Sequence, residues 1–249
     1  MQGDPLSMFL YLFYNADLIA DVKKGEAKIA YVDDANFYAE GRTFQEAYLK
    51  LSDMMERDGR GADWSRCHNS CFESSKLTLV GFSRHRATDP SRPGRQRAEP
   101  RPDLILGGSI IMPAPSHKFL GVLFYQELRW KEQAERTVAK AMKWTLCTRR
   151  LARCVSGISA RQMRQLYQAV AVPGFAYAAD VWFDPVLRPE AGGKARGSVG
   201  TARRLTSVQR IATAAVTGAL HTSATDVMEA HAYLLPVELI FFFFFFISI

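Results

Sequence analysis

The chain has 249 residues, of which 48% are hydrophobic, so it can bury a core for one large domain or two modest ones. Its net charge of +7 and isoelectric point of about 9.3 favour a polyanionic partner. Four cysteines and the lack of a signal-peptide pattern exclude a disulfide-stapled secreted scaffold. We therefore expect an intracellular protein of the nucleus or cytoplasm.

The N-terminal region predicts a helix followed by a β-hairpin. Residues 7–19 are helical by length and apolar content, and a polar loop follows at residues 21–25. Residues 27–32 follow the period-2 pattern of a strand, and residues 35–39 can form a returning strand. The pattern predicts an antiparallel hairpin over residues 26–40, with Asp33 and Asp34 in the turn at its tip.

The rest of the first half predicts one further helix and several short strands. Thr43 and Glu46 are spaced as a capping box before a helix that ends near Gly59. We expect strands at residues 76–82, 104–106, 109–112 and 117–124, with Gly107 and Gly108 forming a hairpin turn. Residues 83–103, rich in Arg and Pro, indicate an exposed, mobile loop. The predicted fold class is therefore α+β.

The second half is predominantly helical. One helix is expected from Trp130 toward Gly157, a second begins at the Ser159 cap and ends at Pro173, and a third covers about residues 201–218. Trp130 and Trp144 are interpreted as core residues. The predicted domains are residues 1–126, residues 127–236 and a phenylalanine-rich tail at residues 237–249.

The tail contains six consecutive phenylalanines, at residues 241–246. A membrane-spanning helix needs about 20 apolar residues, and only eleven residues follow Glu238. We therefore interpret the tail as translated low-complexity or frameshifted sequence, separate from the two folded domains, in preference to a real membrane anchor, and expect no membrane partner.

Adjacent aspartates at a hairpin tip suggest a metal site. Two like charges this close repel each other and raise each other's pKa, and a divalent cation removes that cost. Mg²⁺ prefers carboxylate oxygens and completes its coordination shell with water and substrate phosphates, which suits nucleotidyl transfer. The alternative is that Asp33 and Asp34 form an ordinary polar turn.

Four motifs in a fixed order favour the metal site. They are Gln2-Gly3-Asp4-Pro5-Leu6-Ser7 before an aromatic helix, Tyr31-Val32-Asp33-Asp34 between strands, Lys76 entering a strand, and Lys118-Phe119-Leu120-Gly121-Val122. The order resembles motifs B, C, D and E of reverse transcriptases. The similarity extends through Leu128-Arg129-Trp130, Gln165-Leu166-Tyr167 and Tyr177-Ala178 toward non-LTR retrotransposons of filamentous fungi. The resemblance implies a partial right-hand polymerase, with an antiparallel palm followed by a helical thumb.

The resemblance implies roles for individual residues. Asp33 would bind both catalytic Mg²⁺ ions, with Asp34 in a supporting part. Gln2 and Gly3 would line the template base and the incoming nucleotide, where Gly3 permits close approach. Lys76 would assist the departure of pyrophosphate as an acid or electrostatic partner.

The same resemblance assigns a primer grip and the partners. Phe119, Leu120 and Gly121 would form a hairpin that holds the primer end. The implied partners are an RNA template, a DNA primer and deoxynucleoside triphosphates; no protein partner is predicted. These roles require Gln2, Asp33, Lys76 and Phe119 to lie around one open cleft.

Some residues depart from the family pattern. The family takes a second metal-binding carboxylate from motif A, which would lie upstream of Gln2, together with the fingers, and neither is in this sequence. Asp4 replaces a usual Ser, Met8 a usual Pro and Tyr125 a usual Asp. We therefore expect this chain to be unable to polymerise DNA by itself.

The excess positive charge is local. Residues 131–164 contain nine Lys or Arg and two Glu, so their net charge equals that of the whole chain. On paired helices such a surface would follow a nucleic-acid backbone largely independently of sequence. The residues proposed to contact the backbone are Lys131, Arg136, Lys140, Lys143, Arg149, Arg150 and Arg153. An ordinary solvated helix face is the alternative.

Other features favour simpler readings. The arginines of residues 84–101 could touch RNA, although a solvated loop explains them as well. Cys67, His68, Cys71 and His85 match no standard zinc-finger spacing. Cys147 and Cys154 are interpreted as buried or semi-buried thiols.

Two other functions remain open beside the polymerase. One is a catalytically dead nucleic-acid-binding remnant that uses only the helical region and the arginine loop. The other is a transposon relic without any function.

Overall fold

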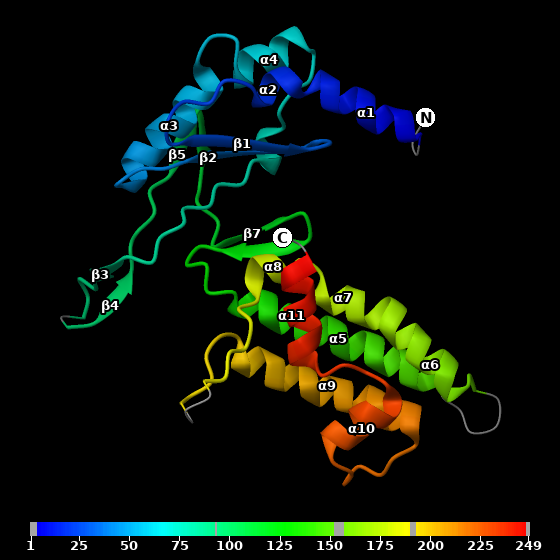
Figure 1. Ribbon diagram of the computed structural model, residues 1–249. Coiled ribbons are helices and arrows are strands. Elements are labelled where there is room, and N and C mark those ends of the chain that lie inside the picture. The colour runs from blue at the N-terminus through cyan, green and yellow to red at the C-terminus, as the bar shows by residue number, and fades with distance from the viewer. Residues whose placement is uncertain (1–3, 93, 152–156, 190–192, 248–249) are drawn as a thin grey trace. The chain divides into compact units, whose positions relative to one another are not determined.

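The computed structural model describes residues 4–92, 94–151, 157–189 and 193–247. The chain forms two compact units (Figure 1). Unit 1 comprises Met1–His117 with Gln126–Leu128, and unit 2 comprises Lys118–Tyr125 with Arg129–Ile249. Residues 118–125, which were predicted to belong to the first domain, group with the helical unit.

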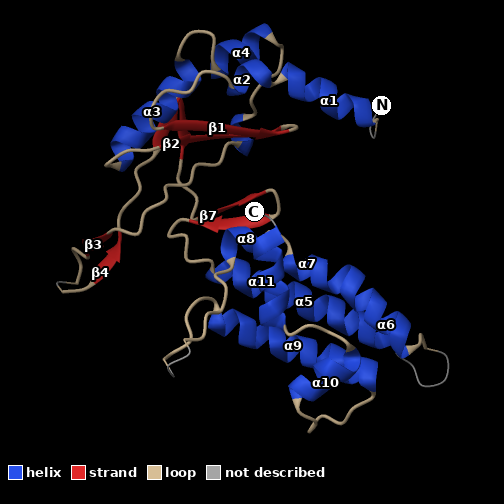
Figure 2. Ribbon diagram, viewed as in Figure 1, coloured by secondary structure: helices blue, strands red, loops and turns tan. Residues whose placement is uncertain are grey.

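Unit 1 combines short helices with separate β-hairpins (Figure 2). Its helices are α1 (Pro5–Tyr14), α2 (Ala16–Ile19), α3 (Phe44–Glu56), α4 (Gly61–Cys67) and the 3₁₀ turn η1 (Ser74–Lys76). Its hairpins are β1 (Glu26–Tyr31) with β2 (Asp34–Ala39), β3 (Arg86–Thr88) with β4 (Gln96–Ala98), and β5 (Leu104–Leu106) with β6 (Ser109–Ile111). Each sheet in the described residues has two strands.

Helix α3 forms the main apolar contact of unit 1. The Oγ1 of Thr43 accepts a hydrogen bond from the Glu46 amide at 3.2 Å, which caps the helix as predicted. Tyr48 of α3 packs with Leu79 and Leu104 in a small buried cluster. The helix also contacts β2, and Figure 1 draws α3 beside the β1–β2 hairpin.

The helix predicted at residues 7–19 is divided in two. Asn15 ends α1 and precedes α2, and its backbone N–H donates to the carbonyls of Phe13 and Tyr11. Asn favours such boundaries because its side chain competes for backbone hydrogen bonds. Asn15 is itself buried, with 4% exposure, and its side chain reaches another element, as described below.

The strand predicted at residues 76–82 is wrong. Lys76 ends the 3₁₀ turn η1, and the following segment makes one isolated bridge, between Leu79 and Pro113. Pro113 has no N–H group, so the ladder cannot extend through it. The segment at residues 83–103, expected to be an exposed, mobile loop, contains the paired strands β3 and β4.

Unit 2 is a helical bundle preceded by one hairpin. The hairpin consists of β7 (Ser116–Phe119), which begins in unit 1, and β8 (Val122–Tyr125). The helices are α5 (Lys131–Leu151), α6 (Ala160–Leu166), the π-helix η2 (Tyr167–Ala171), α7 (Val172–Ala176), α8 (Ala179–Trp182), α9 (Val199–Thr217), α10 (Thr225–Ala232) and α11 (Val237–Ile247). The predicted capping box of Ser159 and Gln162 is confirmed, and so is the helix end at Gly218. Trp130 and Trp144 are partly buried against the core, as expected.

Pro173 does not end the second helix. The chain passes from α6 through the π-helical turn η2 into α7, where Pro173 occupies the first turn. Proline is tolerated in a first turn because its missing N–H would lack a helical partner there. The π turn lets the helix restart without a break in the backbone path.

The beginning of the phenylalanine tail belongs to the core, contrary to prediction. Phe241 of α11 is fully buried and stacks on Phe183 with ring centroids 4.2 Å apart. Its ring also meets Trp182 edge to face, at 5.8 Å. Phe243, two residues further, is 49% exposed. Val237, Ile240 and Phe241 fall on one face of α11 and are buried, which explains why part of the tail is structural.

No single helix within the described ranges is both long and apolar enough to span a membrane. Taken together, α10 and the first eight residues of α11 reach the required length and hydropathy, but they are bent by 58°.

A buried polar network links three elements of unit 2. Gln209 of α9 donates from Nε2 to Glu229 Oε1 of α10 at 2.7 Å, and to the Leu235 carbonyl at 2.9 Å. Tyr167 of η2 donates its hydroxyl to Gln209 Oε1 at 3.4 Å. Burial raises the pKa of Glu229, and the nearby Asp226 adds to the rise, while the bond from Gln209 opposes it. The fold therefore favours the protonated form of this carboxyl.

We expect Glu229→Gln to raise the melting temperature at neutral pH. Because the folded-state pKa is raised, the wild type keeps its full stability below the unfolded pKa and loses part of it as pH rises through the folded pKa. The neutral amide avoids that loss and still accepts the bond from Gln209. Thermal unfolding between pH 4 and pH 8 measures the effect, with Glu135→Gln on the exposed side of α5 as control. A lower melting temperature for Glu229→Gln at neutral pH would contradict this account.

Candidate functional site

The predicted antiparallel hairpin is confirmed, with its turn shifted by one residue. Strands β1 and β2 pair from Glu26 opposite Ala39 to Tyr31 opposite Asp34. The turn is thus formed by Val32 and Asp33, and Asp34 is the first residue of β2. Both aspartates are exposed at the tip of the hairpin.

The turn adopts an uncommon backbone conformation that a buried side chain holds. Val32 has φ of +54°, a region that β-branched residues rarely adopt and that costs about 1–3 kcal/mol. Its carbonyl accepts a hydrogen bond from Asn15 Nδ2 at 2.8 Å. The sequence did not single out Asn15; only its polar character inside an apolar segment could have indicated a role. The bond fixes the direction in which the chain enters Asp33.

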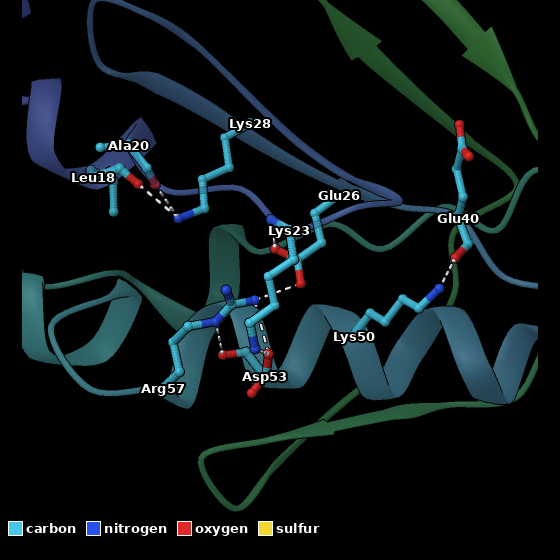
Figure 3. Close-up of polar contacts among 9 residues, drawn as sticks. All are labelled: Leu18, Ala20, Lys23, Glu26, Lys28, Glu40, Lys50, Asp53 and Arg57. Carbon is cyan, nitrogen blue, oxygen red and sulfur yellow. Dashed lines mark hydrogen bonds and ion pairs between the residues drawn. The ribbon is translucent and has the colours of Figure 1, made fainter.

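Ionic contacts hold the base of the hairpin, as Figure 3 shows. Arg57, which follows α3, pairs with Glu26 of β1 at 2.5 Å and with Asp53 of α3 at 2.8 Å. Burial would raise the pKa of Glu26, but the Lys23 amide and the Arg57 guanidinium outweigh it and lower that pKa. The Glu26 carboxylate is therefore ionised at neutral pH and ties β1 to α3.

Two lysines complete these attachments. Lys28 of β1 donates from Nζ to the carbonyls of Leu18 and Ala20, each at 3.2 Å, where α2 ends. Lys50 of α3 donates to the carbonyl of Glu40, just after β2, at 2.6 Å. Cations at a helix end and on free carbonyls offset the exposed backbone dipoles. Together these contacts attach β1 and the residue that follows β2 to the neighbouring helical segments. The base of the hairpin is therefore fixed.

The aspartates provide suitable donor atoms for Mg²⁺, but few of them. Carboxylate oxygens are the ligands that Mg²⁺ prefers, and exposed positions leave room for water and phosphate. The described residues contain no group of three or more His, Cys, Asp or Glu side chains that could hold a metal ion. Asp33 and Asp34 therefore fit part of a magnesium site and need further ligands to complete it.

The other residues assigned to nucleotide chemistry are less well defined. Lys76 is exposed in η1 and pairs with Glu73 at 2.5 Å, and its expected place at the start of a strand is not observed. Gln2 and Gly3 lie outside the described residues. Asp33 and Phe119 belong to different units, so a common cleft of these four residues stays a prediction.

A pocket of about 390 Å³ lies elsewhere in unit 1. Its lining residues are Asp17, Ala20, Asp21, Gly59, Arg60, Asp63, Trp64, Cys67 and His68. The guanidinium of Arg60 pairs with Asp21 and donates to the carbonyl of Asp17 at 2.8 Å, so internal contacts already use its charge. Asp33, Asp34 and Lys76 do not line this pocket.

The residues assigned to the primer grip form the turn of the β7–β8 hairpin. Leu120 and Gly121 both have positive φ, +44° and +87°, as a tight two-residue hairpin turn requires. The single strand predicted at residues 117–124 is thus two strands, and Phe119 ends the first of them.

Tyr177 fixes this turn from within unit 2. Its hydroxyl donates to the Leu120 carbonyl at 2.8 Å. A Cβ at Gly121 would lie 3.0 Å from the Tyr177 ring, so the close approach favours glycine. The motif Tyr177-Ala178 belonged to the resemblance, but its positioning role was not predicted. The turn is therefore held by a side chain more than fifty residues away in sequence.

The basic residues of α5 separate into two sets. Arg136, Lys140, Lys143 and Arg150 follow each other at intervals that keep them within an arc of about 80° of the helix. They are exposed, and their side chains form no ion pair or hydrogen bond with any residue that the structure describes. We call them the α5 basic stripe.

The remaining proposed contacts lie apart from the stripe. Lys131 and Arg149 are also exposed, but they lie about 140° around α5 from the centre of the stripe. One straight nucleic-acid segment cannot follow both flanks of the helix. Arg153 lies outside the described residues. The structure therefore brings together four of the seven predicted residues.

The cysteines form no disulfide among the described residues, in which Cys67, Cys71 and Cys147 are free and exposed. The exposure of Cys147 corrects the expectation of a buried or semi-buried thiol. It lies on α5 between Lys143 and Arg150, a position that faces away from the buried residues of the helix. Cys154 lies outside the described residues.

Comparisons with protein-family models, curated proteins and solved structures gave no match. The likeness to reverse transcriptases therefore rests on the sequence motifs alone, and the functional assignment that follows is a proposal.

Proposed function

We propose that this chain is the palm and thumb portion of an RNA-directed DNA polymerase, the reverse transcriptase of a non-LTR retrotransposon. The main support is the β1–β2 hairpin, which presents Asp33 and Asp34 beside an uncommon turn that Asn15 holds. Backbone conformations of this kind persist where surrounding contacts enforce them, and they cluster at functional sites. A tight two-residue turn calls for positive φ, but Asn, Asp or Gly normally occupies such a position, whereas here the β-branched Val32 is held by a bond from the buried Asn15.

The chemistry proposed for the hairpin is partial. Mg²⁺ bound there would supply charge neutralisation for phosphoryl transfer. Asp33 and Asp34 would contribute oxygen ligands. Lys76 would have to leave its ion pair with Glu73, and would then protonate the departing pyrophosphate or stabilise its negative charge. Because the described residues contain no group of three potential ligands, we infer that the chain by itself binds primer and template without extending the primer.

Two features of unit 2 support the binding part of the proposal. The β7–β8 turn, held by Tyr177, would contact the primer end, and the α5 basic stripe would contact backbone phosphates. The stripe also supports the second candidate, a nucleic-acid-binding remnant without catalysis. A preference for a recessed primer end separates the two candidates, because phosphate contacts alone do not recognise a 3′ terminus.

The first test is primer extension by residues 1–249 on an RNA template with Mg²⁺ or Mn²⁺. We expect binding with no extension above background, since loss of metal ligands removes several kcal/mol of transition-state stabilisation and each 1.36 kcal/mol is tenfold in rate. A matched chain with Asp33→Ala should behave identically. Extension by the unaltered chain that Asp33→Ala abolishes would show that another carboxylate of the chain completes the site, and would overturn the inference of inactivity.

A further inference from the structure

The arginines between Lys76 and Lys118 divide into two groups. All six basic residues of this segment, apart from His, are Arg: Arg84, Arg86, Arg92, Arg95, Arg97 and Arg101. Two of them bind backbone carbonyls of unit 1. Arg84 donates to the carbonyls of Glu127 and Leu128 at 3.2 and 3.1 Å. The Arg84 guanidinium is therefore engaged in contacts within unit 1.

Arg101 has a similar structural role. Its Nε donates to the Gly81 carbonyl at 2.7 Å, and its Nη1 donates to the Glu99 carbonyl at 2.9 Å. The guanidinium also lies over the ring of Phe44, 5.4 Å from the centroid. A hydrogen bond from Ser83 Oγ to Glu99 Oε2 at 3.2 Å joins the segment before β3 to the segment after β4. The base of the β3–β4 hairpin is thereby attached to unit 1.

Asp89 forms hydrogen bonds within the turn of the β3–β4 hairpin. Asp89 Oδ1 accepts bonds from the Ser91 amide and hydroxyl, and the Asp89 amide donates to the Arg95 carbonyl at 2.8 Å. The Ser91 bonds lower the pKa of Asp89, with a smaller effect from Arg97. The Asp89 carboxylate is therefore engaged in the turn itself.

The other four arginines have no such structural contacts among the described residues. Arg86, Arg92, Arg95 and Arg97 are exposed, and within the described residues their side chains form no ion pair or hydrogen bond. Residues 86–98 contain these four arginines and Asp89 as their charged residues, and no apolar side chain larger than alanine or proline. The distal hairpin thus has a net charge of +3 and adds no apolar side chain to the core of unit 1.

We propose that the β3–β4 hairpin binds the phosphate backbone of a nucleic acid. Arginine presents a planar fork of donors that matches phosphate, and a segment that needed only solubility would be served equally by lysine, which this segment lacks. An anionic membrane is a poorer fit, because the hairpin has no apolar side chain to insert between lipids. The register sets Arg97 opposite Ala87 and Arg86 opposite Ala98, so small residues leave the guanidinium groups accessible.

This contact is additional to the α5 basic stripe and does not depend on the polymerase assignment. Backbone contacts of this type are independent of base sequence. Each phosphate neutralised adds about 0.9 to the slope of log K against log salt for duplex DNA.

The test uses the full chain with Arg86, Arg92, Arg95 and Arg97 all changed to Gln, and a second variant with the same four changed to Lys. Binding of a fluorescent DNA duplex is measured by anisotropy between 50 and 300 mM salt. If two or more of the arginines contact phosphates, the Gln variant should lower the salt slope by about 2 or more and the affinity at 0.1 M salt by about 100-fold. The Lys variant should keep most of the slope.

Thermal unfolding should be nearly the same for both variants, because these side chains form no ion pair or hydrogen bond among the residues that the structure describes. An unchanged salt slope and affinity for the Gln variant would overturn the proposal, even if the α5 stripe binds DNA as expected. Equal or tighter arginine-dependent binding to phosphatidylserine vesicles would also overturn it, in favour of a membrane contact.

Discussion

Changing Arg136, Lys140, Lys143 and Arg150 together to Gln is expected to weaken the binding of primer–template duplex by about 10³-fold at 0.1 M salt. The four side chains form one stripe on α5, and no described residue neutralises them. If all four contact phosphates, the salt slope should fall by about 3 to 4. Fluorescence anisotropy across a salt series measures both quantities.

The helix offers a matched control for this experiment. The double variant Lys143→Gln with Arg150→Gln removes one Lys and one Arg from the stripe, and Lys131→Gln with Arg149→Gln removes the same types from the other flank. We expect a slope change of about 2 for the first pair and a much smaller change for the second. Equal effects of both pairs would mean that the net charge of unit 2 determines binding, and that α5 has no preferred contact face.

Phe241→Ala is expected to destabilise unit 2 by about 3–5 kcal/mol, the usual cost of removing a buried aromatic ring. The ring is fully buried between Phe183, Phe175 and Trp182, so its loss leaves a cavity against rigid aromatic neighbours. Urea unfolding followed by tryptophan fluorescence measures the change, since Trp182 lies beside the cavity.

Phe243→Ala removes the same side chain from the same helix at a position that is 49% exposed. It should cost no more than about 1 kcal/mol. Equal stability of the two variants would mean that α11 does not pack on unit 2 in solution, and would restore the interpretation of residues 237–249 as a tail outside the fold.

The sequence predicted local features well where a short-range rule applies. The hairpin at residues 26–40, the Ser159 cap and the end of α9 at Gly218 depend on alternation, capping spacing and glycine, all readable within a few residues. The one-residue shift of the turn was not predictable in this way. A two-residue turn at Asp33-Asp34 is locally more favourable than one at Val32-Asp33, and the Asn15 bond to Val32 comes from a separate element.

The failures share a dependence on distant contacts. Six phenylalanines in a row read as low complexity, yet Phe241 is buried because residues near position 180 provide a pocket for it. Residues 76–82 have the composition of a strand, but they face Pro113, which cannot extend a ladder. For the candidate site, the residues that hold the turns, Asn15 and Tyr177, lie far in sequence from the motifs that they support.

The most direct measurement of the proposed function is photo-crosslinking from the 3′-terminal nucleotide of a DNA primer annealed to a longer RNA template. The account predicts crosslinks to residues 119–121, and tighter binding to the recessed end than to a blunt duplex of equal length. Tyr177→Phe, which removes the hydrogen bond to Leu120, should reduce the crosslinks while it leaves the affinity nearly unchanged. Equal affinity for recessed and blunt duplexes, with crosslinks absent from residues 119–121, would contradict the assignment of this chain to a polymerase.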